Sequence, residues 1–227
     1  MREHRDMFAG LETVVVNAPA GSATNIVMLH GYSMSSAALS PFAHSLGVNA
    51  NFYFPQAPQR SLDGGWTWWH VDAIKRAQAL AMGPRNLAHA QPERQSARRQ
   101  ICALISEIKR RNPHCTIVCG FSQGGMLILD AVLLEQLRID GLALFSCSLI
   151  DRDSWAVHAD QVRNLPTFIS HGYQDPDLAF DAGCQLRDFL LNAGAQVEWV
   201  PFEGRHEIPL PVWRRFKQFA AAQTQPA

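Results

Sequence analysis

The sequence lacks several features that mark whole classes of protein. Its 227 residues carry 20 basic and 20 acidic side chains, so no net charge favours binding to nucleic acid or to an anionic membrane. No apolar run approaches the ~18–20 residues that a membrane span requires. The first residues, Met-Arg-Glu-His-Arg-Asp, lack the apolar core of a signal peptide. We therefore expect a cytoplasmic protein that binds no nucleic acid and makes no stable membrane insertion.

Cysteine is also scarce, and its five positions show no C-x-x-C spacing that would suggest a metal site. An odd count in a chain expected in the cytoplasm favours reduced thiols over disulfides. Cys115 and Cys119 have the same parity in one predicted strand and should lie on one face. Internal repeats, low-complexity segments and linkers are absent as well. With 47% hydrophobic residues, the chain is expected to form a single domain over residues 1–227.

The stretch Gly120-Phe-Ser122-Gln-Gly124 stands out among the residues that are present. An apolar, β-branched run over 114–119 precedes it and predicts a buried strand. The apolar run over 126–135 that follows predicts a buried helix. Ser122 would then sit on a sharp strand-to-helix turn, where glycines permit a tight backbone and the helix start favours a developing anion. The alternative is a glycine-rich turn between two core elements, with no chemistry.

Predicted strands and helices alternate along the chain, which indicates an α/β fold with a mostly parallel central sheet and helices on both faces. Residues 1–10 are polar and expected to be loose, and the first strand, 11–17, is expected near an edge. The run from Arg94 to Arg99 is expected on the solvent face of its helix. The remaining expected strands are 25–30, 51–55, 139–146, 166–171 and 196–200, and the expected helices are 37–46, 73–81, 91–111, 178–192 and 208–222.

Residues 56–92 do not fit this alternation and are interpreted as a lid-like or pocket-lining excursion. Gly64-Gly65 interrupts the segment, and Trp66, Trp68 and Trp69 follow, which are half of the six tryptophans in the chain. Two interpretations stay open for these side chains. They pack in the core, or they form an apolar wall for an acyl chain, in which case Trp66 and Trp69 would contact substrate.

Polar residues collect at the predicted carboxyl ends of the strands, where ligands bind in such sheets. Ser122, Asp175 and His206 occur there in the chain order Ser…Asp…His, which matches α/β-hydrolases. An imidazole takes the proton of a serine during attack, and a carboxylate fixes and stabilises that imidazole. The backbone N–H groups of Tyr32 and Gln123 are the candidates for an oxyanion hole. The other candidates are Asp151, Asp153 and Asp177 as the carboxylate, His30 and His171 as structural histidines bonded to loop backbone, and Cys147 as a small wall residue at the substrate site.

The chain resembles the carboxylesterase/phospholipase family that includes the acyl-protein thioesterases, within the α/β-hydrolase fold. The matching stretches are 27–32, 55–60 with Trp69, 120–125, 145–147, 171–176 and 204–206, which together span most of the chain. The resemblance implies a triad of Ser122, Asp175 and His206, an oxyanion hole at Tyr32 and Gln123, and no metal or cofactor. Ser33-Met34 and the segment 72–91 depart from the family pattern. Because those parts shape the pocket, the departures leave the substrate open.

These observations predict a serine carboxylesterase that hydrolyses short- to medium-chain acyl esters through an acyl-serine intermediate. The expected partner is a small-molecule acyl ester or thioester, and a homodimer is left open. An acyl-protein thioesterase or a lysophospholipase-type hydrolase is the alternative within the same chemistry. A dienelactone-type hydrolase fits less well, because those enzymes use cysteine where Ser122 stands. The alternative from another class is a non-catalytic ligand-binding protein of the same fold.

Overall fold

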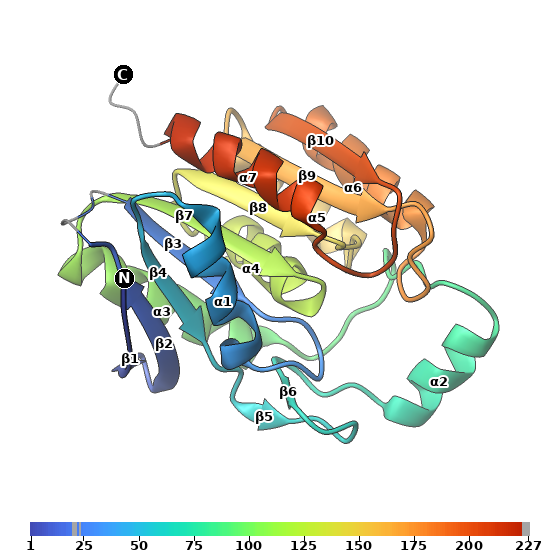
Figure 1. Cartoon of the computed structure of the whole chain (residues 1–227). Coiled ribbons are helices and arrows are strands. Elements are labelled where there is room, and N and C mark those ends of the chain that lie inside the picture. Colours follow the sequence, from blue (N-terminus) through green and yellow to red (C-terminus); the bar gives the residue numbers. More distant parts are fainter. Residues whose placement is uncertain (20–21, 23, 224–227) are drawn as a thin grey trace.

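The computed structural model describes residues 1–19, 22 and 24–223. Within them, eight strands form one sheet in the order β1-β2-β4-β3-β7-β8-β9-β10 (Figure 1). Only β1–β2 and β2–β4 pair antiparallel, so the predicted mostly parallel sheet and the α/β fold class are confirmed. The strands are β1 (Arg2–Phe8), β2 (Leu11–Asn17), β3 (Thr24–Leu29), β4 (Asn51–Pro55), β7 (Cys115–Phe121), β8 (Gly141–Phe145), β9 (Pro166–Gly172) and β10 (Gln196–Phe202).

Helices cover both faces of the sheet, as the alternation predicts (Figure 1). The side chains of β3 alternate between two apolar cores: Val27 and Leu29 pack with one set of helices, and Ile26 and Met28 with the other. On the first face lie α3 (Gln95–Arg111), α4 (Gln123–Leu134) and α6 (Phe180–Asn192), and on the second lie α1 (Ser36–Leu46) and α7 (Leu210–Gln223). Cys119 is buried in the second core with Cys115 against it, which confirms their shared face.

The excursion between β4 and α3 holds a small hairpin, β5 (Gln59–Arg60) and β6 (Trp66–Thr67), followed by α2 (Ala73–Ala81). Figure 1 shows α2 standing away from the sheet, and the helix has no buried residue. Two short helices between β8 and β9 were not predicted, α5 (Arg152–Val157) and η1 (Ala159–Val162). The single domain predicted for 1–227 stays a prediction. No helix in the described ranges is long and apolar enough to span a membrane.

The N-terminal residues are ordered, so the prediction of a loose start is wrong. β1 pairs with β2 along its whole length, from Arg2 opposite Asn17 to Phe8 opposite Leu11. The turn at Ala9 and Gly10 has positive φ at both residues (47° and 78°), the backbone that a tight hairpin requires. β1 is an edge strand and is largely exposed, so neither face has to bury apolar side chains. Its sequence is therefore polar and lacks the hydrophobic alternation of a half-buried strand. β2 is therefore an interior strand rather than an edge strand.

The basic run at the start of α3 also differs from the prediction. The Arg94 side chain is only 5% exposed and donates to Asp130 Oδ1 (2.7 Å) and to Asp151 (2.9 Å). Arg98 donates to Asp130 Oδ2 (3.0 Å), and the indole N–H of Trp155 donates to Oδ1 (2.7 Å). Asp130 is fully buried because α4 lies between the sheet and its neighbours, so its charge requires these partners. Within this run the solvent-face prediction holds for Arg99, which is exposed.

Loss of the Asp130 carboxylate should destabilise the fold strongly. Asp130→Ala would leave Arg94 without its most buried partner, and breaking a buried ion pair typically costs about 3–5 kcal/mol. The free energy of unfolding, measured in urea, should fall by about that amount. Asp153→Ala is the control, because Asp153 is exposed and should change stability by less than about 0.5 kcal/mol. Equal losses in the two variants would contradict this account of the network.

Candidate active site

Ser122 lies at the sharp turn between β7 and α4, in the predicted strand-to-helix context. Its φ of 51° and ψ of −118° are outside the regions that L residues favour, and such strain persists only where the surroundings impose it. The surroundings here are very tight. A Cβ on Gly120 would lie 2.3 Å from the amide nitrogen of Gly125, and a Cβ on Gly124 would lie 2.6 Å from the carbonyl oxygen of His30. Only glycine fits at either position.

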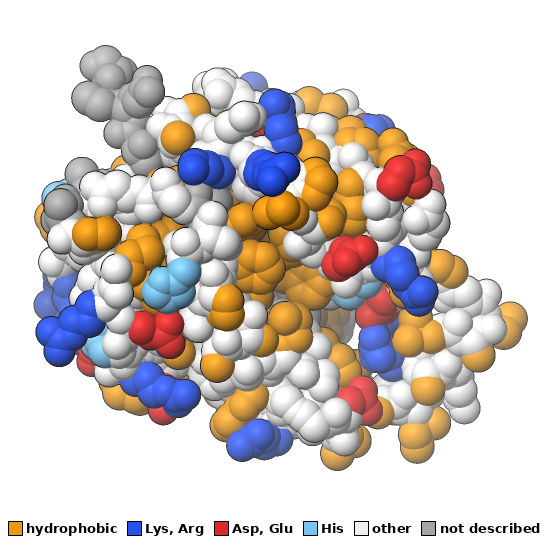
Figure 2. Space-filling model, viewed as in Figure 1, with side chains coloured by type: hydrophobic (Ala, Val, Ile, Leu, Met, Phe, Trp, Pro, Cys, Tyr) orange, Lys and Arg blue, Asp and Glu red, His pale blue; other side chains and the backbone are white. Residues whose placement is uncertain are grey.

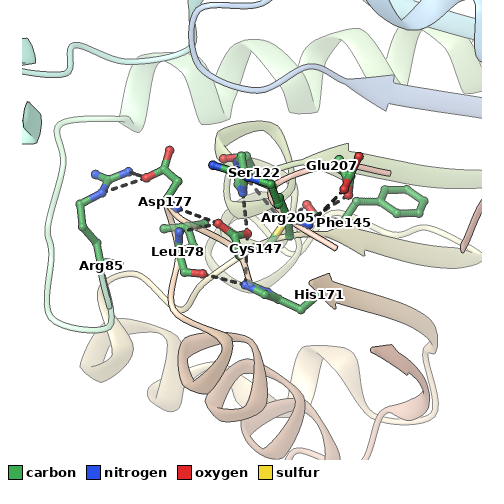
Figure 3. A network of polar contacts seen from close by, with 12 residues as sticks. Arg85, Ser122, Phe145, Cys147, His171, Asp177, Leu178, Arg205 and Glu207 are labelled. Carbon is green, nitrogen blue, oxygen red and sulfur yellow. Dashed lines mark hydrogen bonds and ion pairs between the residues drawn. The ribbon is translucent and has the colours of Figure 1, made fainter. Parts of the chain in front are cut away.

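Asp175 and His206 come from the loops after β9 and β10 and meet in space. His206 Nδ1 lies 2.7 Å from Asp175 Oδ2. The other carboxylate oxygen, Oδ1, accepts the backbone N–H groups of Asp177 (2.8 Å) and Leu178 (2.9 Å). Figure 3 shows the Leu178 carbonyl directed at the imidazole of His171. Because both oxygens are engaged, this buried carboxylate has a fixed orientation, and it fixes the imidazole in turn.

The other aspartates considered from the sequence have different partners. Asp177 forms ion pairs with Arg76 and Arg85, and Asp151 with Arg94. Asp153 is exposed in the first turn of α5. Of these four carboxylates in the described chain, only Asp175 bonds to His206.

The backbone N–H groups of Tyr32 and Gln123 are the predicted donors of an oxyanion hole. Tyr32 and Gln123 both line the cavity that Ser122 lines. Gln123 is the first residue of α4, so its N–H has no acceptor within the helix. Among the described residues, no backbone or side-chain oxygen accepts from the N–H of Tyr32 or of Gln123. Free donors at a helix start favour negative charge, as the sequence analysis expected.

His30 and His171 are buried and bonded to loop backbone, which confirms their structural interpretation. His30 Nδ1 lies 2.8 Å from the carbonyl oxygen of Gly31, and Nε2 accepts the N–H of Ala57 at 3.1 Å. Burial lowers the pKa of His30 to about 4, so this imidazole is neutral at pH 7. His171 Nε2 lies 3.0 Å from the carbonyl oxygen of Leu178, and burial also lowers its pKa.

The side chain of Gln123 has a function that the sequence analysis missed, since only its N–H was considered. Its Oε1 accepts the N–H of Trp68 (3.0 Å), and its Nε2 donates to the hydroxyl of Thr67 (3.0 Å) and the carbonyl of Trp69 (3.3 Å). The indole N–H of Trp68 donates to the carbonyl of His30 (2.8 Å). Residues 67–69 are therefore anchored to the turn that carries Ser122. The glutamine directly after the serine in the sequence was the available signal.

Each tryptophan of the cluster has its own environment. Trp68 is core, and Trp69 is buried but reaches the cavity of Ser122. Trp66 lines a separate hollow near the start of α1, with Arg60 3.8 Å above its ring. Cys147 is buried beneath the serine turn, where a Cβ on Gly125 would lie 2.3 Å from its sulfur. The structure thus brings Trp69 to the cavity, but not Trp66 or Cys147.

The cavity at Ser122 has a volume of about 650 Å³, and Figure 2 shows the hollowed surface with hydrophobic side chains inside it. Its apolar lining comes from Trp69, Val71, Leu87, Pro92, Met126 and Ile150, and its charged lining from Asp72, Lys75, Arg76, Arg85 and Asp177. His206 lines a smaller, neighbouring groove of about 250 Å³ with Phe121, whose ring centroid is 4.7 Å from the imidazole. In the described part of the chain, no group of three or more His, Cys, Asp or Glu side chains could hold a metal ion.

Known proteins resemble this chain in both sequence and structure. Residues 11–223 match the model of the phospholipase/carboxylesterase family. A probable SOBER1-like carboxylesterase of Arabidopsis thaliana is 28% identical over 83% of this chain and 74% of its own length. An acyl-protein thioesterase 1 of Yarrowia lipolytica is 25% identical over 84% of this chain and 87% of its own.

Solved structures share the fold. The crystal structure of a carboxylesterase from Mesorhizobium loti superposes with a TM-score of 0.76 at 18% identity, covering 97% of this chain and 99% of that one. The structure of Arabidopsis thaliana SOBER1 gives a TM-score of 0.70 at 23% identity, covering 89% of this chain and 99% of that one. These likenesses confirm the α/β-hydrolase fold. Because the family model spans nearly the whole chain, the protein belongs to the phospholipase/carboxylesterase family.

Proposed function

We propose that the protein is a serine carboxylesterase that hydrolyses short- to medium-chain acyl esters through an acyl-serine intermediate. The observation that supports this most is the 2.7 Å bond between His206 Nδ1 and Asp175. It forms at the carboxyl ends of the strands, where Ser122 occupies its strained turn. The other ring nitrogen of His206, Nε2, is free to act as the base that a serine nucleophile requires. The esterase relatives support the same chemistry.

In the proposed reaction, the Ser122 hydroxyl attacks the ester carbonyl while His206 Nε2 takes its proton. The negative charge on the carbonyl oxygen is stabilised by the N–H groups of Tyr32 and Gln123. Asp175 stabilises the imidazolium that forms. When the tetrahedral intermediate collapses, the carbon–oxygen bond of the ester breaks and His206 gives its proton to the leaving alcohol. Water then attacks the acyl-serine by the same steps and releases the acid.

The two hollows suggest how the ester lies. The leaving alcohol must be next to the imidazole that protonates it, and His206 lines the smaller groove with Phe121 and Ile208. The acyl chain then extends into the larger cavity, against Trp69 and Met126. Its volume of about 650 Å³ lies within the range of small-molecule sites.

Two other functions remain alternatives. An acyl-protein thioesterase or lysophospholipase-type hydrolase would use the same residues, and the thioesterase name of the Yarrowia lipolytica relative favours the first. A non-catalytic ligand-binding role would leave the strained turn and the buried bond of His206 to Asp175 without a purpose. We further propose, from the sequence, that the protein acts in the cytoplasm on small molecules; a homodimer remains open.

Ser122 should react with a fluorophosphonate probe, because its hydroxyl is activated only in the folded site. We expect intact protein to gain the mass of one probe less that of HF, because the serine oxygen displaces fluoride, and peptide mass spectrometry should locate the label at Ser122. Ser122→Ala should lose the label and reduce nitrophenyl butyrate hydrolysis by at least about 10³-fold. Its unfolding free energy should change little. An unlabelled Ser122 in folded protein would favour the non-catalytic alternative.

Asp175→Asn tests the assignment of the carboxylate. The amide cannot stabilise an imidazolium, and it sets the wrong tautomer on His206, so kcat should fall by about 10⁴-fold. Steady-state hydrolysis of a neutral ester measures the effect. Asp153→Asn is the matched control, since Asp153 is an exposed alternative from the sequence, and it should retain activity within about twofold. A small effect of Asp175→Asn would mean that another carboxylate orients His206.

A series of nitrophenyl esters with about two to sixteen acyl carbons tests the predicted chain length. The cavity volume leads us to expect the highest kcat/KM for short and medium chains. A rate that keeps rising to sixteen carbons would instead favour the thioesterase alternative, which acts on long acyl groups. The rate of nitrophenol release with Ser122→Ala is subtracted from each rate, so that only turnover at the serine counts.

A further inference from the structure

The cavity at Ser122 has a charged wall that ester hydrolysis itself does not use. The wall is formed by Arg76 on α2, Arg85 in the segment after α2, and Asp177, two residues after Asp175. Figure 3 shows the Arg85 guanidinium directed at the Asp177 carboxylate. Arg85 Nε donates to Asp177 Oδ1 at 3.0 Å, and a second Arg85 nitrogen, Nη2, donates to the same oxygen. Arg76 Nη2 donates to the other oxygen, Oδ2.

The charges in this wall do not cancel. The cavity lining holds two carboxylates and three basic side chains in the described chain. Lys75 pairs with Asp72 at 3.9 Å, which leaves Arg76 and Arg85 to share the single carboxylate of Asp177. Burial by itself would raise the pKa of Asp177, but the two arginines lower it, so this carboxylate stays ionised. The described side chains that line the cavity therefore include one more basic than acidic group.

Both guanidinium groups also keep unused donors. A guanidinium has five N–H groups. No described oxygen or nitrogen accepts from Arg85 Nη1, or from Nε or Nη1 of Arg76. The side chains are held in place nonetheless: Arg76 and Arg85 are 23% and 18% exposed, and Asp177 is 15% exposed. Fixed, partly buried guanidinium groups with free N–H forks are suited to carboxylate recognition.

The backbone around Arg85 is fixed as well. Its N–H donates to the carbonyl of Asp177 (2.8 Å), and its carbonyl accepts the N–H of Ala179 (2.9 Å). The segment that carries Arg85 is thus bound to the loop whose N–H groups hold Asp175. Arg76 gains a further contact from the ring of Tyr32, whose centroid lies 5.3 Å from its guanidinium carbon. Arg76, Arg85 and Asp177 are thus joined to the loop that carries Asp175 by backbone and side-chain contacts.

We propose that Arg76 and Arg85 form a subsite for a carboxylate at the far end of the acyl chain, so that the preferred substrates are monoesters of dicarboxylic acids. This inference rests on the proposed esterase function, because it takes the acyl chain to lie in the larger cavity. A phosphate would belong to the alcohol part of an ester, which lies on the side of His206. The one basic side chain in excess among those that line the cavity also matches a carboxylate monoanion.

The test compares esters of equal length with and without the terminal charge. The substrates are the mono-4-nitrophenyl esters of adipic and suberic acid, against 4-nitrophenyl hexanoate and octanoate. The ratio of kcat/KM for the anionic ester to that for the neutral one is the readout. Arg85→Gln should lower this ratio about tenfold, a factor that corresponds to about 1.4 kcal/mol, and the change should appear in KM. Arg76→Gln should act in the same direction, and Arg85→Lys should keep part of the preference.

Arg60→Gln is the matched control, because Arg60 belongs to the same excursion but stacks on Trp66 outside this cavity. It should leave the ratio unchanged. Thermal melting of every variant identifies any change caused by unfolding. A ratio that stays the same, within about twofold, in both Arg76→Gln and Arg85→Gln overturns the carboxylate subsite.

A binding measurement separates this inference from the esterase function. Calorimetry with the Ser122→Ala protein should show tighter binding of monomethyl adipate than of dimethyl adipate, and adding Arg85→Gln should remove the difference. Selective binding of the monoanion without turnover of any ester would contradict the esterase function and support the subsite. Turnover of hexanoate with equal binding of the two adipates would support the esterase function and overturn the subsite.

Discussion

The close packing at the turn after β7 is the constraint on which the site depends. Gly124 at the start of α4 lies against the carbonyl of His30 at the end of β3, and no larger residue fits there. That contact brings together two neighbouring strand ends, one carrying Ser122 and the other leading to Tyr32. The hydroxyl and two free N–H groups therefore share one cavity without any bond between them. The strain in the backbone of Ser122 is held by this packing.

The second half of the site depends on the loop after β9. Asp175 is held by the N–H groups of Asp177 and Leu178, and Arg85 bonds to the same loop through its backbone and its side chain. The excursion before α3 is thereby part of the frame that orients His206. Its other attachment is the side chain of Gln123, which holds residues 67–69. Between these two anchors, α2 buries no residue, and the ion pair of Arg76 with Asp177 holds it to the loop after β9.

The sequence predicted the sheet, and it singled out candidate site residues, where local patterns carry the information. Apolar runs located β3, β7 and β9, and the position of polar residues just after them singled out Ser122 and Asp175. β1 was missed because an exposed edge strand needs no hydrophobic alternation. The burial of Arg94 depends on Asp130 from another helix, which no local pattern records. The charged cavity wall was missed for the same reason, since its members come from three separate segments.

A chain with equal numbers of acidic and basic residues can still hold strong local charge, and the two arginine clusters show how. Beside α4, Arg94 and Arg98 face three carboxylates, those of Asp130, Asp151 and Glu135, and neither side chain lines the cavity at Ser122. Beside Ser122, Arg76 and Arg85 face one carboxylate and border open space. Buried charge that is fully paired serves the fold, because leaving it unpaired is costly. At the Ser122 cavity, basic side chains are in excess, so the matching negative charge comes from a molecule that enters the cavity. In an esterase, that molecule is the substrate.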